Sequence, residues 1–97
     1  MDRATDRDFG LATVQLWRVR PEKNERRFYA MTVTFDLFGE AILVRNWGRI
    51  GTGGRLRRDV CADIVAAGAA LNDLARRKRR RGYTAWNSAE AVNDGAR

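Results

Sequence analysis

The stretch RNWGRIGTGG, residues 45–54, places two arginines and a tryptophan directly before a glycine-rich turn. Neighbouring side chains of a strand alternate between its two faces, so Arg45, Trp47 and Arg49 would share one face. An exposed indole can stack on a base or a sugar, guanidinium groups neutralise phosphates, and glycine N–H groups can approach them closely. These residue types predict contact with a nucleic acid. The residues selected are Arg45, Trp47, Gly48, Arg49 and Gly51.

Trp47 has two interpretations. Tryptophan is more often buried than exposed, so its indole could pack in the core with the arginines stacked on it from the rim. Alternatively, Ile42, Val44 and Ile50 form the core side of the strand and leave Trp47 on the outward side. The alternation predicts that the face with Ile42, Val44 and Ile50 is the core face. It does not decide whether the Trp47 indole is buried or exposed.

A second basic segment, RRKRRR over residues 76–81, precedes Gly82 and Tyr83. Cations suit the last turns of a helix, and six in a row point in several directions, so only some of them can meet one partner. Tyr83 is expected to cap the core, with a second stacking surface as the alternative. Arginines after the glycine turn and at the helix end are expected to make salt-sensitive phosphate contacts. The predicted binding residues therefore also include Arg55, Arg57, Lys78, Arg80 and Tyr83, with Arg58 beside them.

The charge balance supports a polyanionic partner. The 97-residue chain carries a net charge of +7, and 17 of its 19 basic residues are arginine. Residues 10–83 hold 16 of these bases against 7 acids, so the excess belongs to the part expected to fold. The planar arginine fork suits phosphates, although a merely solvated basic surface is the alternative. The predicted partner is a nucleic acid, with DNA favoured over RNA, and a protein partner is the second possibility.

The sequence offers little for catalysis. It has no histidine, no paired acids in an apolar setting and no phosphate-gripping loop followed by a lysine and a hydroxyl. Cys61 is the lone cysteine and is expected to be a free core thiol. No zinc-binding set, membrane span or signal peptide is visible. We therefore expect a cytoplasmic protein that is not an enzyme and needs no metal or cofactor.

The elements that would position these residues follow from hydrophobic periodicity. Period-two alternation predicts strands, and a later period of 3.6 predicts a helix. Tyr29, Met31, Val33 and Phe35 share one face of the second strand and are expected to be core residues. The strands fall at about 13–19, 27–36, 41–50 and 55–60, and the helix at about 62–81.

Residues around the helix agree with that assignment. Asp59 or Asp63 can begin the helix, and Gly82 is placed to end it. Gly68 costs about 1 kcal/mol in helix propensity, which suggests close packing against the sheet at that point.

The expected architecture is α+β, an antiparallel sheet of about four strands with one C-terminal helix packed on a face. A single domain over residues 13–83 would follow a flexible segment at 1–12 and precede a disordered tail at 84–97.

Four separated pieces of the chain, RRFYAMTV, DLFG, RNWGRIG and LARRKRRRGY, occur in this order. Together they resemble the WGR domain family, which is named for the Trp-Gly-Arg motif found here at Trp47, Gly48 and Arg49. The resemblance covers about residues 13–83 and is greatest to small stand-alone bacterial members. It departs from the family at Arg55, where members often have glutamine.

The resemblance implies a noncatalytic module that binds DNA near a strand break, as in the DNA-dependent poly(ADP-ribose) polymerases. It assigns Trp47 to the sugar of a terminal nucleotide and makes Arg49 a contact residue. ADP-ribosyl transfer is not expected, because 97 residues leave no room for a catalytic domain. The alternative function is a protein-interaction module of a bacterial regulatory system that docks an acidic partner through the same residues.

Overall fold

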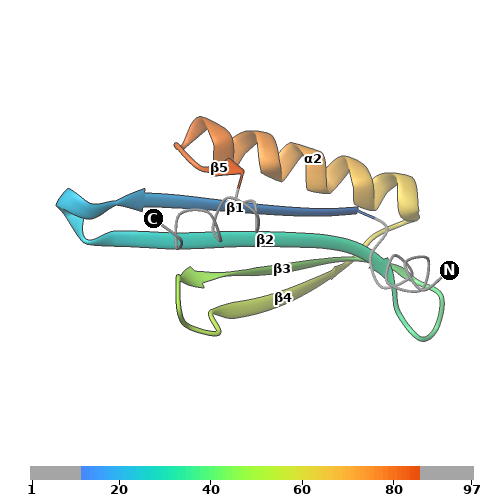
Figure 1. Ribbon diagram of the computed structural model, residues 1–97. Coiled ribbons are helices and arrows are strands. Elements are labelled where there is room, and N and C mark those ends of the chain that lie inside the picture. Colours follow the sequence, from blue (N-terminus) through green and yellow to red (C-terminus); the bar gives the residue numbers. More distant parts are fainter. Residues whose placement is uncertain (1–11, 86–97) are drawn as a thin grey trace, which may run out of the picture.

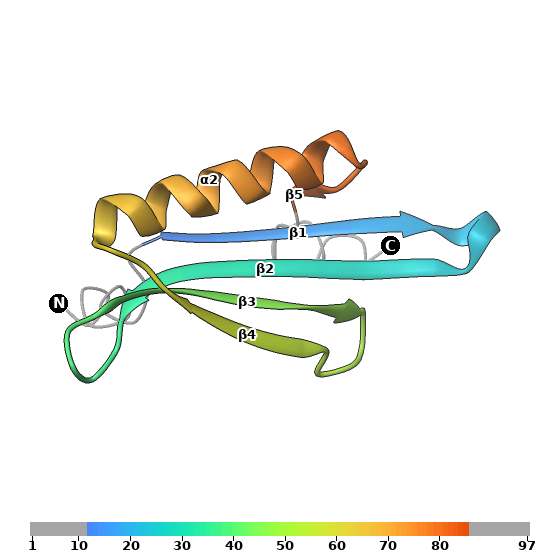
Figure 2. The same cartoon turned by 180° about the vertical axis from the view of Figure 1, so that it is seen from behind.

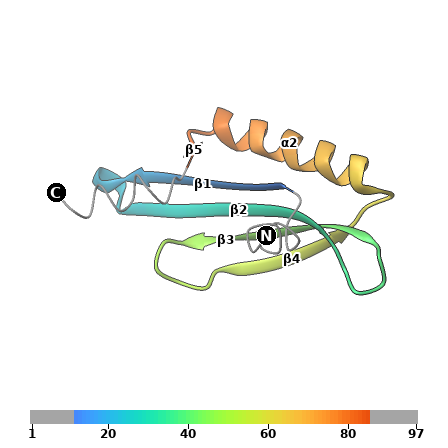
Figure 3. The same ribbon diagram turned by 45° about the vertical axis from the view of Figure 1, so that its right-hand side comes forward.

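The computed structural model describes residues 12–85, which form a five-stranded antiparallel sheet with one long helix across a face (Figure 1). The strands lie in the order β4-β3-β2-β1-β5. The helix α2 covers one face of this sheet, and β4 is the edge strand farthest from it (Figures 2 and 3). The elements are β1 Ala12–Arg20, the 3-10 helix η1 Pro21–Lys23, β2 Glu25–Phe35, β3 Ala41–Arg49, β4 Arg55–Val60, α2 Ile64–Arg80 and β5 Thr84–Ala85.

The predicted α+β architecture is confirmed. The four strands and the helix lie close to their expected ranges, and the fifth strand, β5, is a two-residue addition that the sequence did not predict. β5 pairs with β1 opposite Leu16 and Trp17. Residues 1–11 and 86–97, most of the two segments predicted to be flexible or disordered, lie outside the described residues.

The core lies between α2 and the sheet. Ala67, Leu71 and Ala75 recur every fourth residue of α2, so they form one buried stripe. This stripe packs against Met31 and Leu43, both fully buried. Tyr29, Met31 and Val33 are core residues as predicted, but Phe35 is exposed. Phe35 is the last residue of β2, beside the turn that follows it.

The prediction for the faces of β3 was wrong. Directly paired residues of neighbouring strands share a face, and the register pairs Val33 with Leu43 and Tyr29 with Trp47. The core face of β3 therefore carries Leu43 and, further along, Trp47, whereas Ile42 points to the other side of the sheet. Ile42 and Leu43 are adjacent and both buried, so alternation within β3 alone could not identify the face toward the helix.

The two ends of α2 are fixed by the residues that the sequence selected. Asp63 is the N-cap, and its Oδ1 accepts a hydrogen bond of 2.8 Å from the Ala66 N–H. Beyond the C-terminus, Gly82 has a φ of +98°, and the Tyr83 N–H donates to the Lys78 carbonyl at 3.1 Å. This C-terminal motif folds the chain back, so Tyr83 is buried against the sheet beside the last turn of α2.

Candidate nucleic-acid interface

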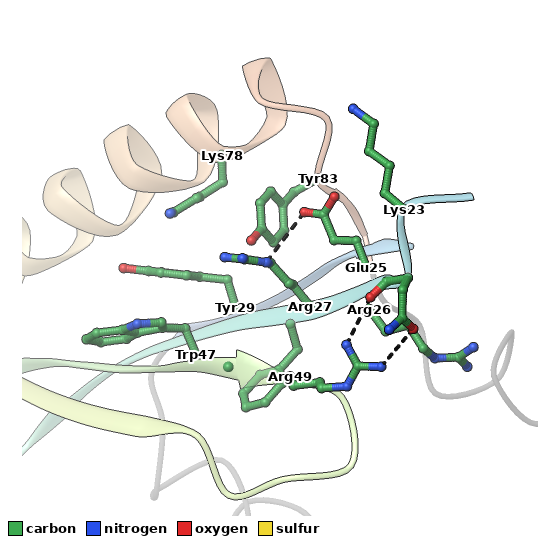
Figure 4. A pocket seen from close by; sticks show the side chains of 12 residues that line it. Lys23, Glu25, Arg26, Arg27, Tyr29, Trp47, Arg49, Lys78 and Tyr83 are labelled. Atoms are coloured by element: carbon green, nitrogen blue, oxygen red, sulfur yellow. Dashed lines mark hydrogen bonds and ion pairs between the residues drawn. The ribbon is translucent and has the colours of Figure 1, made fainter. Parts of the chain in front are cut away.

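A cleft of about 610 Å³ opens on the helix side, where the end of β3, the start of β2 and the C-terminal end of α2 meet (Figure 4). Its walls combine aromatic rings with cations, and a single cavity thus collects residues from four separate parts of the sequence. The aromatic lining residues are Phe28, Tyr29, Trp47 and Tyr83, and the basic ones are Lys23, Arg26, Arg27, Arg49 and Lys78. Asn24, Glu25 and Gly48 complete the lining.

Tyr29 and Trp47 form the aromatic floor of the cleft. They are directly paired across β2 and β3, and their rings stack with centroids 5.7 Å apart and planes inclined by 18°. Tyr29 is buried, whereas Trp47 is half-buried and lines the cleft. The structure therefore combines the two interpretations of Trp47, since the indole packs on the core and still borders a cavity.

Lys78 forms the wall of the cleft that belongs to α2. Its Nζ lies 4.3 Å from the centroid of the Tyr29 ring and 5.6 Å from that of Tyr83. Figure 4 shows the ammonium group reaching from the helix toward Tyr29. Burial lowers the pKa of Lys78, and the nearby charges of Arg81 and Arg18 lower it further. The faces of the Tyr29 and Tyr83 rings offset part of the unfavourable burial of the ammonium group, because a cation is attracted to a ring face.

Gly48, the middle residue of the Trp-Gly-Arg motif, has a steric role. A Cβ atom at this position would lie 2.7 Å from the Gly54 Cα, because the turn after β3 folds back onto the strand. Gly54 has a φ of +71°, and a Cβ there would collide with the Trp47 carbonyl oxygen and lie 2.8 Å from the Phe28 ring. Gly48 and Gly54 therefore let the glycine turn pack directly behind Trp47.

Arg49 joins the end of β3 to the turn between β1 and β2. Its Nη1 donates to the Asn24 carbonyl at 3.1 Å, and its Nη2 donates to the Asn24 Oδ1 at 3.2 Å (Figure 4). Asn24 follows η1 with a φ of 53°, a left-handed conformation that asparagine tolerates. The guanidinium is exposed at the mouth of the cleft, so it is held in place while remaining accessible.

Arg45 lies on the same face but outside the cleft. Its Nη2 lies 3.0 Å from the Asp59 Oδ2, and its Nη1 donates to the Tyr29 hydroxyl at 3.3 Å. Arg57 pairs with the other Asp59 oxygen at 2.8 Å. Arg45 and Arg57 thus already have a carboxylate partner, and the half-buried Arg45 contacts the Tyr29 hydroxyl without lining the cleft.

The cleft brings together half of the predicted binding residues. Those lining it are Trp47, Gly48, Arg49, Lys78 and Tyr83, and those outside it are Arg45, Gly51, Arg55, Arg57 and Arg80. Arg55 and Arg80 are exposed.

A charged cluster at the start of β2 was not predicted from the sequence. Glu25 accepts a hydrogen bond of 2.9 Å from the Arg18 Nε and a second, short one from the Arg18 Nη2, while the Arg27 Nε lies 3.5 Å away. The hydrogen bonds from Arg18 lower the pKa of Glu25, against an opposing effect of burial. Residues 20–26 fall between the predicted strands at 13–19 and 27–36, and only the register, which pairs Arg18 with Arg27 and Arg20 with Glu25, reveals the cluster. The available signal was a pair of acids, Glu22 and Glu25, among five bases between residues 18 and 27.

With this geometry in place, comparison with known proteins identifies the class. The family model of the WGR domain matches residues 12–90, so the chain belongs to the WGR domain family. A similar protein is the uncharacterized protein y4dW of Sinorhizobium fredii, which is 42% identical over 66 residues, or 68% of this chain. The matched region is 32% of that relative, so the chain spans about a third of its length. No solved structure matches significantly.

Two further observations concern residues 12–85 alone. Histidine, cysteine and acidic side chains do not gather there in a group of three that could hold a metal ion. Within the same residues, α2 is neither long nor apolar enough to cross a membrane, and the other helix has three residues.

Proposed function

We propose that this chain is a noncatalytic module that binds nucleic acid, with DNA as its ligand and strand ends or nicks as its preferred sites. One observation carries the proposal: a half-buried tryptophan, stacked on Tyr29, borders a cleft whose other walls supply Lys78, Arg27 and Arg49. Aromatic surface next to several cations suits a ligand that alternates flat rings with phosphates.

The geometry supports different roles for the aromatic residues and for the cations of the cleft. Tyr29 covers one side of the Trp47 ring system, so a sugar or a base would contact the indole surface that faces the cleft. Such a contact contributes about 1–3 kcal/mol, and it fits a terminal nucleotide, which has no further base stacked beyond it. The preference for ends follows from the family resemblance, whereas the availability of the indole follows from the structure.

The cations would hold the phosphate backbone. Arg49 is exposed and oriented by Asn24, and Lys78 is oriented by the rings of Tyr29 and Tyr83. Preorganised cations lose little conformational freedom when they bind, so they favour affinity more than mobile surface arginines do. Arg79, Arg80 and Arg81 are exposed next to Lys78 and extend the positive field beyond the cleft.

A salt-dependent titration tests the proposal. The full chain is titrated at several salt concentrations with a nicked duplex, a blunt-ended duplex, a covalently closed duplex, a single strand and an RNA duplex. We expect tighter binding to the nicked and blunt-ended DNA than to the closed DNA, and a slope of log K against log salt of about −0.9 for each phosphate contact. Equal affinity for all five ligands would contradict the preference for ends, and the absence of binding at low salt would contradict the proposed function.

The edge strand β4 favours a second function, that of a module docking an acidic protein. Arg55 and Arg57 are exposed on this strand, and Leu56 between them is also exposed. An edge strand can pair with an extended segment of another chain, and acidic side chains on that segment would complement the arginines. Weak binding to every nucleic acid in the titration, together with a stable complex with an acidic partner, would favour this function.

A further inference from the structure

Glu25 gives the cleft a negative charge at a place where a phosphate would be expected. The other charged residues of the described lining are cations: Lys23, Arg26, Arg27, Arg49 and Lys78. The Glu25 side chain is only 14% exposed, and Figure 4 shows its carboxylate beside Tyr83 and joined to Arg27 by an ion pair. A carboxylate that is largely removed from water must be held by strong donors.

Arg18 supplies those donors, and two further arginines add ion pairs. Arg18 reaches the Glu25 Oε2 through both Nε and Nη2, Arg27 Nε lies 3.5 Å from the same oxygen, and Arg20 Nη1 lies 3.9 Å from Oε1. Arg18 is itself fixed, because its Nη1 donates to the Arg81 carbonyl at 2.6 Å and its guanidinium lies over the Tyr83 ring at 5.0 Å. An arginine fork binds a carboxylate and a phosphate with the same bidentate geometry.

We infer that Arg18, Arg20 and Arg27 form a phosphate subsite at the edge of the cleft, and that the Glu25 carboxylate occupies this subsite in the unbound protein. Arg27 and Glu25 line the cleft, whereas Arg18 and Arg20 reach Glu25 without lining it. The ligand class is the phosphodiester of a nucleic-acid backbone, which has to displace Glu25 to reach these guanidiniums. Glu25 is therefore an internal competitor that limits affinity. The inference rests on the proposed function, because it describes how that same cleft selects and holds its ligand.

The surroundings of Glu25 are compatible with this exchange. Glu25 is the first residue of β2 and follows Asn24, so its side chain borders solvent at the end of the hairpin. Arg27 is 62% exposed and can turn from the carboxylate to a ligand without unfolding the strand. The hydrogen bond from Arg18 lowers the pKa of Glu25, so the competing carboxylate is charged at neutral pH.

A structural role makes the opposite prediction. If Glu25 only staples β1 to β2, its removal leaves Arg18 without a partner, lowers stability and weakens binding or leaves it unchanged. If Glu25 competes with the ligand, its removal frees the guanidiniums for phosphate and tightens binding. The direction of the change in affinity separates the two roles.

The test compares Glu25→Gln with Glu22→Gln. Glu22 lies in η1 of the same hairpin, is exposed and does not line the cleft, so its substitution raises the net charge equally and serves as the control. With blunt-ended duplex DNA at low salt, we expect Glu25→Gln to lower the Kd by about 3- to 10-fold and to steepen the salt slope by about 0.9, the value of one added phosphate contact. Glu22→Gln should lower the Kd by less than about 2-fold, because exposed charges are screened, and leave the slope unchanged.

A double-mutant cycle with Arg27→Ala tests whether the tighter DNA binding of Glu25→Gln comes from the released arginines of the subsite. In the Arg27→Ala background, Glu25→Gln should gain clearly less affinity, because one of the released guanidiniums is missing. Glu25→Asp keeps the charge but withdraws the carboxylate by one methylene, and it should give a smaller tightening than Glu25→Gln. Thermal unfolding of each variant establishes that it is folded at the temperature of the titration.

The outcomes are separable from those of the proposed function. If wild type binds DNA and Glu25→Gln binds no tighter than Glu22→Gln, the inference is wrong and the proposed function stands. Titration with tripolyphosphate, followed by tryptophan fluorescence, examines the subsite without DNA. If Glu25→Gln binds tripolyphosphate more tightly than Glu22→Gln, the subsite is supported even where DNA does not bind. If the two variants bind tripolyphosphate equally, or neither binds it, the inference is wrong.

Discussion

The two ends of the sheet have opposite chemistry. At the cleft end, where β2 begins and β3 ends, aromatic rings and cations surround a cavity. At the other end, which we call the turn end, residues 36–40 connect β2 to β3 and α2 begins (Figure 1). Residues 31–41 and 59–75 contain no lysine or arginine. Leu37 and Phe38 at the tip of the turn are 99% and 89% exposed.

The difference lies in how each end is held together. The turn end is built by its own backbone, since the Asp36 Oδ1 accepts hydrogen bonds from the Phe38 and Glu40 N–H groups at 2.9 and 2.8 Å. At the cleft end, side chains from four segments hold one another through Glu25, Asn24 and the aromatic rings. Substitutions at the cleft end should therefore affect several partners at once, whereas those at the turn tip should act locally.

The largest expected difference between the two ends is in stability, and substitution of one glycine at each end measures it. Gly54→Ala at the cleft end adds a methyl group that collides with Trp47 at a φ of +71°, and we expect it to lower the free energy of unfolding by about 2–4 kcal/mol. Gly39→Ala at the turn end has a φ of +83° but nothing within 4 Å, so only the backbone strain of about 1–2 kcal/mol applies. Urea denaturation measures the free energy of unfolding of both variants. Equal losses of stability in Gly54→Ala and Gly39→Ala would contradict the expected difference.

Two aromatic residues give the next contrast, which concerns binding. Trp47→Ala should weaken binding to nicked DNA by about 5- to 150-fold, the equivalent of 1–3 kcal/mol of stacking. Phe38→Ala at the turn tip should change neither the affinity nor, by more than about 0.5 kcal/mol, the stability.

Trp47→Phe is the matched control for the loss of packing on Tyr29. It should retain most of the stability and part of the affinity, because it keeps a ring at that position. If Trp47→Ala is folded and binds nicked DNA as tightly as wild type, the proposed role of the indole is wrong.

Lys78→Gln examines the charge at the cleft end without removing the side chain. We expect the affinity for duplex DNA to fall by about tenfold at low salt and the slope of log K against log salt to become shallower by about 0.9, as one phosphate contact is lost. Stability should change little, since burial disfavours the ammonium group in the folded chain. Arg76→Gln, on the same helix but outside the cleft lining, is the control and should leave the slope almost unchanged.

The smallest expected effect lies between the two ends. Gly68 was expected to pack closely against the sheet, but a Cβ at this position would meet no atom within 4 Å, so that expectation was wrong. Gly68→Ala should therefore raise the free energy of unfolding by about 0.5–1 kcal/mol through helix propensity alone. Thermal unfolding checks the gain, and DNA affinity should stay constant.

The sequence predicted the local features of this fold better than the relations between its strands. The helix, its Asp63 cap and the Gly82 turn follow from neighbouring residues, because capping is a local interaction. The face of β3 was assigned wrongly because both Ile42 and Leu43 are apolar, and only pairing with β2 selects between them.

The candidate site shows the same limit. Trp47, Arg49 and Lys78 were selected from motif and charge, and the structure places all three at one cleft. Tyr29 was identified as a core residue but not as the partner on which Trp47 stacks, and Glu25 was not identified at all. Both relations depend on cross-strand register, which alternation within a single strand does not specify.

The C-terminal motif of α2 gives the cleft a stability of its own. The Lys78 carbonyl accepts the Tyr83 N–H at 3.1 Å, while the Lys78 ammonium lies over Tyr29. Fraying of the last turn of α2 would withdraw Lys78 and Tyr83 together and leave the β2–β3 pairing intact. We expect this local opening, and not global unfolding, to set the lifetime of the assembled cleft. Hydrogen exchange at the Tyr83 amide would report it directly, and a ligand that bridges Lys78 and Trp47 would slow that exchange.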